Sequence, residues 1–296
     1  MLPTLPACHD GRGPVAAIAV VTDSTADLPV DVAEARGIRV VPMSVSFRGE
    51  TLISRITISD EEFYARLVAS EALPTTSQPS PAWFEEAYAD AVDEGQRGIV
   101  SIHVAGRLSG TVGVARSRAK GVPIPVEVID SGQVGGALAL AVLATQRRAD
   151  AGGSLDEVAA TAREACAMAR IHVVVDSLDY LRRGGRLTGT QAMVGTMLRV
   201  KPILTVHDGA VELVARARTT SRALTEVAHR VVTDLDGRAC HAVVSHAVAP
   251  ERAAIAWEHL EDAGLRVRSR LTCPIGPVLG THTGPGTVAI SVLPVG

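Results

Sequence analysis

Hydroxyl side chains gather in a proline-bounded segment of the sequence, Pro74–Pro81. Within it, Thr75, Thr76 and Ser77 stand between prolines, which restrict backbone rotation at their own position and at the residue before them. The Ser-Pro pair that ends the segment is typical of a helix N-cap followed by the first helical residue. Hydroxyls ahead of a helix N-terminus can bind an anion, although a capped loop without a ligand fits the same residues.

Three more polar segments follow apolar runs that predict strands buried on both faces. They are Thr22–Thr25, Arg107–Thr111 and Asp130–Gly132. Because the carboxyl ends of parallel strands meet at one edge of a sheet, where ligands bind in open α/β folds, we expect one polar site at that edge. Ser109 is a candidate contributor to this site.

Two segments of the C-terminal half can supply positive charge or a proton-transfer group. Arg182, Arg183 and Arg186 surround a glycine pair, which suits either a bound anion or a solvated helix C-terminus. His282 lies between two threonines and is followed by Gly-Pro-Gly, where the backbone permits close approach. Such a histidine can bind a carboxylate or phosphate, or act as a general acid or base.

Other catalytic and metal-binding patterns are missing from the sequence. Ser109 is not in a GxSxG segment, and neither GxxxxGK[ST] nor GxGxxG occurs. His241 and His246 are five residues apart in a predicted strand and would face opposite ways, which disfavours a zinc site. His103, in an apolar strand, is predicted to be a core histidine. We therefore predict no catalytic residue, no metal and no cofactor.

The composition of the chain argues against two classes of function, nucleic-acid binding and membrane spanning. A chain of 296 residues with a net charge of −3 gives no electrostatic basis for nucleic-acid binding. The longest apolar runs, residues 15–21 and 137–144, are too short to cross a bilayer. No CxxC pair occurs, so we expect reduced thiols and a cytoplasmic location. The cysteines are Cys8, Cys166, Cys240 and Cys273.

The alternation of strand and helix signals predicts an α/β protein with two domains. Residues 1–13 are predicted to be a disordered leader. Residues 14–152 are predicted to form a mostly parallel sheet flanked by helices, with a strand at 38–45 and a helix at 133–150. Residues 153–296 are predicted to form a mixed α/β domain, with a helix at 191–199, a polar loop at 280–286 and a strand at 287–293 that closes the sheet. Capping boxes at Ser59–Glu62 and Ser154–Glu157 mark two helix starts.

The sequence resembles the DegV family, fatty-acid-binding proteins that include the FakB subunits of bacterial fatty acid kinase. Six segments in the same order carry the resemblance: Val21–Pro29, Thr75–Ser80, Leu108–Thr111, Tyr180–Arg186, Lys201–Leu204 and Gly280–Gly286. The match covers nearly the whole chain after the leader.

The resemblance implies two α/β domains with one long-chain fatty acid, such as palmitate or oleate, buried between them. It assigns the carboxylate to a polar end formed by Thr76, with Thr75 and Ser77 beside it, and by Ser109, Arg186 and His282. It also implies a non-catalytic carrier with a fatty acid kinase catalytic subunit as partner, and it allows transient contact with a membrane surface. One departure is Ala105-Gly106, where many members carry a serine pair, so that one hydroxyl donor is absent.

Two alternatives stay open at this stage. The chain could be a phosphotransfer enzyme or subunit related to dihydroxyacetone kinases, with His282 contacting a small carbonyl substrate, or a lipid-responsive regulator without a kinase. A long apolar tunnel between the domains would favour the carrier, and a small polar cup would favour the enzyme. The candidate tunnel linings are Leu138, Leu140, Met193, Val194, Met197 and Leu198.

Overall fold

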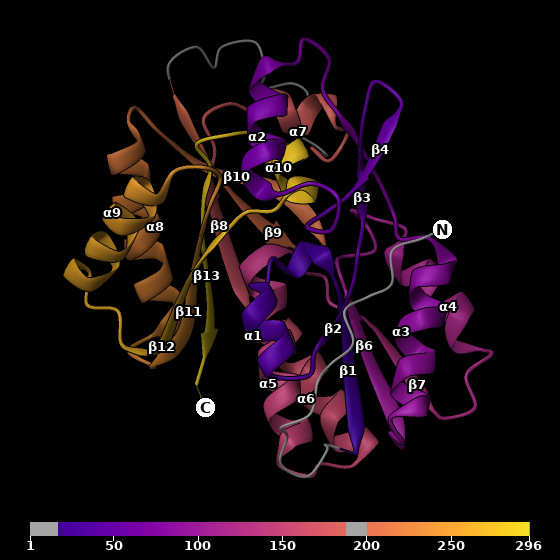
Figure 1. Ribbon diagram of the computed structural model, residues 1–296. Helices are drawn as coiled ribbons and strands as arrows, with labels where there is room; N and C mark the ends of the chain where they lie inside the picture. The colour runs from indigo at the N-terminus through magenta and orange to yellow at the C-terminus, as the bar shows by residue number, and fades with distance from the viewer. Residues whose placement is uncertain (1–16, 188–199, 296) are drawn as a thin grey trace.

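The computed structural model in Figure 1 describes residues 17–187 and 200–295 of the protein. The chain forms two α/β halves, one built on a four-stranded sheet and the other on a six-stranded sheet, with a small three-stranded sheet beside them. This confirms the predicted fold class. The predicted leader, 1–13, is not among the described residues. The predicted helix 191–199, with Met193, Val194, Met197 and Leu198, also lies outside them.

The first sheet is entirely parallel, with the strand order β2-β1-β6-β7. Its strands are β1 (Ile18–Asp23), β2 (Arg39–Val41), β6 (Gly98–His103) and β7 (Val126–Asp130). Every residue of β1 and β6 is buried, because helices cover both faces of the sheet (Figure 1). The helices are α1 (Val30–Ala35), α3 (Pro81–Asp93), α4 (Thr111–Ala119), α5 (Gly135–Asp150) and α6 (Leu155–Met168).

The strand predicted at 38–45 is divided between two sheets. It stops at Val41, and after Pro42 the chain enters β3 (Ser44–Phe47) of the small antiparallel sheet. The other strands of this sheet are β4 (Glu50–Ile53) and β5 (Thr75–Ser77), in the order β4-β3-β5. The segment read as a hydroxyl-rich loop is therefore an edge strand in which Thr76 pairs with Val45. β-Branched threonines suit a strand, which explains the difference.

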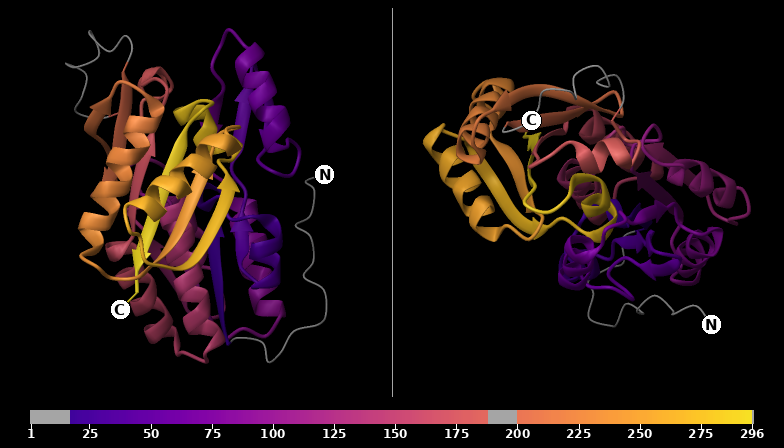
Figure 2. Two further views of the ribbon diagram at one scale, coloured as in Figure 1. Left: turned by 90° about the vertical axis from the view of Figure 1, so that its left-hand side faces the viewer. Right: turned by 90° about the horizontal axis from the view of Figure 1, so that it is seen from above.

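The second sheet has the order β10-β9-β8-β13-β11-β12 and is antiparallel except between β11 and β12. Its strands are β8 (Arg170–Val174), β9 (Lys201–His207), β10 (Ala210–Ala217), β11 (Cys240–His246), β12 (Val267–Pro274) and β13 (Val288–Pro294). The last strand completes the sheet from its centre, which fits its buried, apolar sequence. Helices α8 (Thr220–Leu235) and α9 (Pro250–Asp262) lie on the sheet face that is turned away from the first half (Figures 1 and 2).

Three predicted helix starts have different outcomes. Ser154 and Glu157 form the reciprocal capping box that was predicted for α6. Ser59 caps α2 (Asp60–Ala69) by accepting from the Glu62 backbone, but the Glu62 side chain pairs with Arg66 instead of completing the box. Ser80 precedes Pro81 at the start of α3 as predicted, yet its side chain makes no capping hydrogen bond.

The polar loop predicted at 280–286 is mostly helical. Helix α10 (Pro277–Thr283) begins with a proline at its first position and ends at Gly284, which has a positive φ of 76°. α10 packs against α2, β3, β5 and α7 (Asp179–Arg183), between the two halves (Figure 2). This position makes α10 the element that carries C-terminal residues into contact with the N-terminal half.

The domain boundary at Gly152-Gly153 stays a prediction. Helix α6, which follows it, packs on α5 and on strands β6 and β7 of the first sheet. Within the described ranges, no helix is long and apolar enough to cross a membrane. Cys166, Cys240 and Cys273 are free and buried.

Candidate functional site

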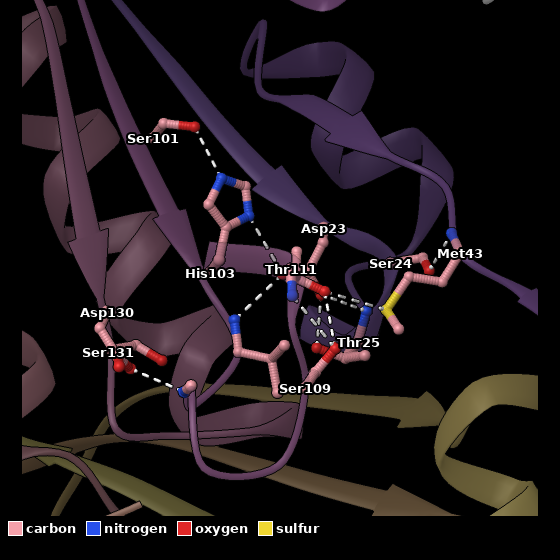
Figure 3. A network of polar contacts seen from close by, with 12 residues as sticks. Asp23, Ser24, Thr25, Met43, Ser101, His103, Ser109, Thr111, Asp130 and Ser131 are labelled. Carbon is pink, nitrogen blue, oxygen red and sulfur yellow. Dashed lines mark hydrogen bonds and ion pairs between the residues drawn. The ribbon is translucent and has the colours of Figure 1, made fainter. Parts of the chain in front are cut away.

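A buried polar network lies where β1 and β6 end (Figure 3). The Oδ1 atom of Asp23 accepts from the backbone and the hydroxyl of Thr25, at 3.0 and 2.6 Å. Its Oδ2 atom accepts from Val104 N at 3.0 Å and lies 3.1 Å from His103 Nδ1. Burial alone would raise the pKa of Asp23, but the contacts with His103, Thr25 and Val104 hold that pKa below its usual value.

His103 is fully buried and hydrogen-bonded at both ring nitrogens. Its Nε2 atom lies 2.6 Å from Ser101 Oγ, which in turn bonds to Tyr88 Oη at 2.8 Å. The prediction of a satisfied core histidine is therefore confirmed. This network fixes the loop ends of the first sheet and leaves His103 no free ring nitrogen.

A cavity of about 370 Å³ lies between the two halves. This volume falls in the range of small-molecule sites. Most of the lining is aliphatic and comes from both sheets, from the chain around α5 and from α10: Val104, Leu108, Val134, Ile171, Val173, Leu204, Val206, Val211, Ile275, Val278 and Leu279. Leu138 and Leu140, predicted as linings, are buried core residues that are not among those lining the cavity.

The polar part of the lining includes Thr76, Ser109, Arg186 and His282. His282 Nε2 lies 3.0 Å from Thr76 Oγ1, a contact between residues 206 positions apart in the sequence. Among the described residues, His282 Nδ1 is buried without a hydrogen-bond partner. Burial and the nearby Arg186 charge lower the pKa of His282 to about 4, so its imidazole is neutral at pH 7.

Arg186 is the arginine of the 182–186 cluster that reaches the cavity. Its Nε and Nη1 atoms donate to the carbonyls of Leu108 and Gly184, at 3.3 and 2.8 Å. In the described part of the chain, no carboxylate lies within salt-bridge distance of it. Arg182, by contrast, is exposed and pairs with Asp179 at 3.5 Å. Arg186 thus presents a guanidinium to the cavity whose partners, among residues 17–187 and 200–295, are backbone carbonyls.

A glycine lets His282 approach the turn that carries Arg186. A side chain at Gly184 would collide with the His282 ring. The Gly-Gly-Arg sequence therefore allows the His282 ring to pack against Gly184 and places the Arg186 charge two residues later. Gly185, with a φ of 70°, adopts the left-handed conformation that favours glycine, so both glycines before Arg186 have a structural reason.

The remaining hydroxyl candidates differ in position. Ser109 Oγ lies at the cavity and bonds to Thr111 Oγ1 at 2.8 Å. Ser77 also lines the cavity, whereas Thr75 is exposed and is not among the lining residues. The roles of these side chains toward a ligand stay predictions.

The Ala105-Gly106 departure does not touch this cavity. Ala105 is fully buried, and Gly106 N donates to Asp130 Oδ1 at 3.0 Å. A β-carbon at position 106 would lie 2.5 Å from Asp130 Oδ2, so a serine there would require the Asp130 side chain to move.

The sequence predicted that all the polar loops meet in one site at the sheet edge, and this was wrong for the loop Asp130–Gly132. Thr25 and Ser109 line the cavity described above, but Asp130–Gly132 and Arg107 line a separate cavity of about 850 Å³ on the other side of the 105–110 loop. Sequence reasoning also missed Asp27, which is 2% exposed and lines the first cavity. Its position just after Thr22–Thr25 was the available signal.

Comparisons with known proteins agree on one family. Residues 17–295 match the family model described as the DegV family. A DegV domain-containing protein of Streptomyces coelicolor is 36% identical over 275 residues, which cover 93% of this chain and 98% of that protein. A structure described as fatty acid binding of a DegV family protein from Thermus thermophilus has a TM-score of 0.89 at 34% identity, and the match covers 94% of this chain and 99% of that one. A stearic acid-binding protein from Eubacterium ventriosum has a TM-score of 0.84 at 26% identity, with 93% and 97% covered.

Proposed function

The chain belongs to the DegV family, and from that premise we propose that it is a non-catalytic carrier of one long-chain fatty acid, bound in the cavity between its halves. The aliphatic lining supports an acyl chain as ligand. A C16 tail has about fifteen methylene-sized groups, which at ~0.8 kcal/mol each contribute on the order of 12 kcal/mol before the costs of binding. The tail therefore supplies most of the affinity. The same lining speaks against the small-carbonyl enzyme, which would need a small polar cup.

The observation that carries the proposal is the pair formed by Arg186 and His282. Arg186 and His282 occur together on a largely aliphatic cavity. Among the described residues, the Arg186 guanidinium has only backbone partners and His282 Nδ1 has no hydrogen-bond partner. Buried polar groups are normally hydrogen-bonded, so the Arg186 guanidinium and the His282 imidazole indicate a ligand with a charged acceptor. We assign the carboxylate to Arg186, His282, Thr76 and Ser109, with Thr75 and Ser77 flanking Thr76.

The finer part of the proposal concerns a partner. A carrier whose head-group site is formed by side chains from both halves can present the carboxylate to a fatty acid kinase catalytic subunit. The kinase would transfer the terminal phosphoryl group of ATP to a carboxylate oxygen and release ADP. Arg186 and His282 would stabilise the added negative charge of the acyl phosphate. Dependence on ATP implies a cytoplasmic protein, and ligand exchange would bring it transiently to a membrane surface.

Native mass spectrometry of the purified protein, with extraction and lipid analysis of bound material, tests the carrier. We expect one co-purified fatty acid of about C16–C18, or stoichiometric uptake of palmitate or oleate. A protein that carries no lipid and takes up neither fatty acid would contradict the proposal.

The presentation role has its own test. His282→Ala should leave tail binding in place and reduce phosphorylation of the bound fatty acid by a fatty acid kinase catalytic subunit that phosphorylates the wild-type complex. Thr75→Ala is the matched control, because Thr75 is exposed and does not line the cavity. Equal phosphorylation of the His282→Ala and wild-type complexes would exclude this role for His282.

A further inference from the structure

Three consecutive residues just before α10 are each held through a backbone atom by a side chain of the N-terminal half. The hydrogen bonds run from Arg55 Nη2 to Pro274 O at 3.1 Å, from Tyr64 Oη to Ile275 O at 2.9 Å, and from Gly276 N to Asp27 Oδ1 at 3.0 Å. We call this set the 274–276 clamp. It joins the end of β12 in the second sheet to three different segments of the first half.

The clamp bonds of Tyr64 and Asp27 are buried, the Arg55 bond to Pro274 O is exposed, and the Arg55 side chain has supporting partners. Tyr64 and Asp27 are 3% and 2% exposed. Arg55 also donates to Leu28 O at 3.0 Å and to both carboxylate oxygens of Asp60 at 3.2 Å. Because breaking a buried hydrogen bond leaves a polar group unpaired, these contacts hold residues 274–276 in one position.

Two glycines allow α10 to lie directly against the N-terminal half. A β-carbon at Gly276 would lie 2.7 Å from Asp27 Oδ1, and one at Gly280 would lie 2.5 Å from Tyr64 Oη. The two positions are four residues apart and therefore share one face of the helix. Tyr64 thus bonds to the Ile275 carbonyl just before α10, and its hydroxyl takes the space that a side chain at position 280 would need.

His282 follows on the same helix, six residues after Gly276, which corresponds to about 9 Å along the axis. The imidazole meets Thr76 of the N-terminal half at 3.0 Å, so its placement depends on where α10 lies relative to β5. A shift of α10 would separate His282 from Thr76 and from the turn of Arg186. The clamp fixes the start of the helix whose end carries this imidazole.

We propose that Asp27, Arg55 and Tyr64 are positioning residues for His282, which hold α10 against the N-terminal half so that the imidazole meets the carboxylate of the bound ligand. This inference rests on the proposed function. It means that head-group recognition depends on residues that hold α10 in place as well as on those that contact the head group. Asp27 also lines the cavity, whereas Arg55 and Tyr64 are not among its lining residues. Breaking the clamp should therefore reduce the preference for a fatty acid over its uncharged ester, while affinity for the acyl chain is retained.

The test compares dissociation constants for palmitate and methyl palmitate in matched variants. Tyr64→Phe removes the clamp hydroxyl, and Tyr88→Phe is the control, because it removes another buried tyrosine hydroxyl bond, to Ser101, remote from α10. We expect Tyr64→Phe to reduce the preference for the acid by about three- to tenfold with ester affinity within twofold of wild type. Tyr88→Phe should leave the preference unchanged. In a His282→Ala background, Tyr64→Phe should have no further effect on the preference, because coupled residues are not additive.

A second pair of variants keeps the test independent of Tyr64. Asp27→Asn retains a side-chain oxygen for Gly276 N and should keep the preference, whereas Asp27→Ala should lose it. Equal weakening of both ligands by the clamp variants, or an undiminished effect in the His282→Ala background, would overturn the inference. Wild-type protein that binds neither ligand would instead contradict the proposed function, and the inference with it.

Discussion

Two histidines in different regions of the molecule have opposite surroundings. His103, at the end of the first sheet, contacts Ser101 and Asp23 through its two ring nitrogens and is fully buried. His282, on α10 between the halves, contacts Thr76 through one nitrogen and leaves the other buried without a partner among the described residues. The difference separates a histidine whose hydrogen bonds are complete within the core from one that, under the proposed function, would be completed by a ligand.

The comparison extends to charge. The carboxylate beside His103 is that of Asp23, and it accepts hydrogen bonds from the backbone N–H groups of Thr25 and Val104. The charge of Arg186, by contrast, disfavours the protonated imidazole of His282 and helps to lower its pKa. A satisfied network stabilises a fold, whereas an unsatisfied one next to a cavity indicates a site that is completed by binding.

The largest expected difference is in folding stability. His103→Ala should lower the free energy of unfolding by about 3–5 kcal/mol, because it breaks a buried pair and leaves the Asp23 carboxylate without that partner. His282→Ala breaks one hydrogen bond at an existing cavity and should cost only about 1 kcal/mol. Urea unfolding of both variants measures this, and equal losses would break the comparison.

The pH dependence of stability should also separate the two sites. The pKa of His282 falls from 6.5 to about 4 on folding, so the unfolded chain binds a proton in this window that the folded protein does not. As the pH falls from 6.5 to 4, wild type should therefore lose up to roughly 3 kcal/mol relative to His282→Gln.

The opposite contribution of Asp27, whose pKa is raised to about 7 by its burial, is present in both proteins and cancels in this difference. Chemical unfolding at several pH values between 4 and 7 gives the result. A difference between wild type and His282→Gln that does not change with pH would contradict it.

The affinity for the fatty acid should depend strongly on Arg186, which lies beside His282. Arg186→Ala removes a charge-assisted bond of roughly 1.5–3 kcal/mol, so palmitate should bind about ten- to hundredfold more weakly, with methyl palmitate unaffected. Arg183→Ala, an exposed position outside the cavity, is the control. Titration of both ligands measures the effect, and equal losses for acid and ester would remove Arg186 from the head-group site.

The smallest expected effect is at Thr76. Thr76→Val keeps the shape of the β5 residue and removes the hydroxyl 3.0 Å from His282, which should reduce palmitate affinity about fivefold, or ~1 kcal/mol. Thr75→Val, the neighbouring exposed position, should change it by less than twofold. The same titration tests both, and identical behaviour of the two threonines would show that the contact with His282 does not matter for binding.

Much of the framework could be predicted from apolar runs and polar segments at strand ends. The strands that hold Asp23 and His103 are mostly apolar and do not alternate with polar residues, and their burial follows from that pattern. The family resemblance then pointed to Thr76, Ser109, Arg186 and His282, all of which line one cavity.

The local form of the site could not be predicted in the same way. Segment 75–77 is too short for a strand pattern, and it becomes β5 only by pairing with β3. The seven-residue α10 contains glycine, proline and threonines, which resemble a loop until tertiary packing favours the helix. The 274–276 clamp uses backbone atoms as partners, and these leave no trace in the amino-acid sequence.

The most direct measurement is a crystal structure of the protein loaded with palmitate. The account predicts the acyl chain along the aliphatic lining of the cavity between the halves, with the carboxylate within hydrogen-bond distance of Arg186 and of the His282 imidazole. A carboxylate placed away from both side chains, or an acyl chain outside this cavity, would contradict it.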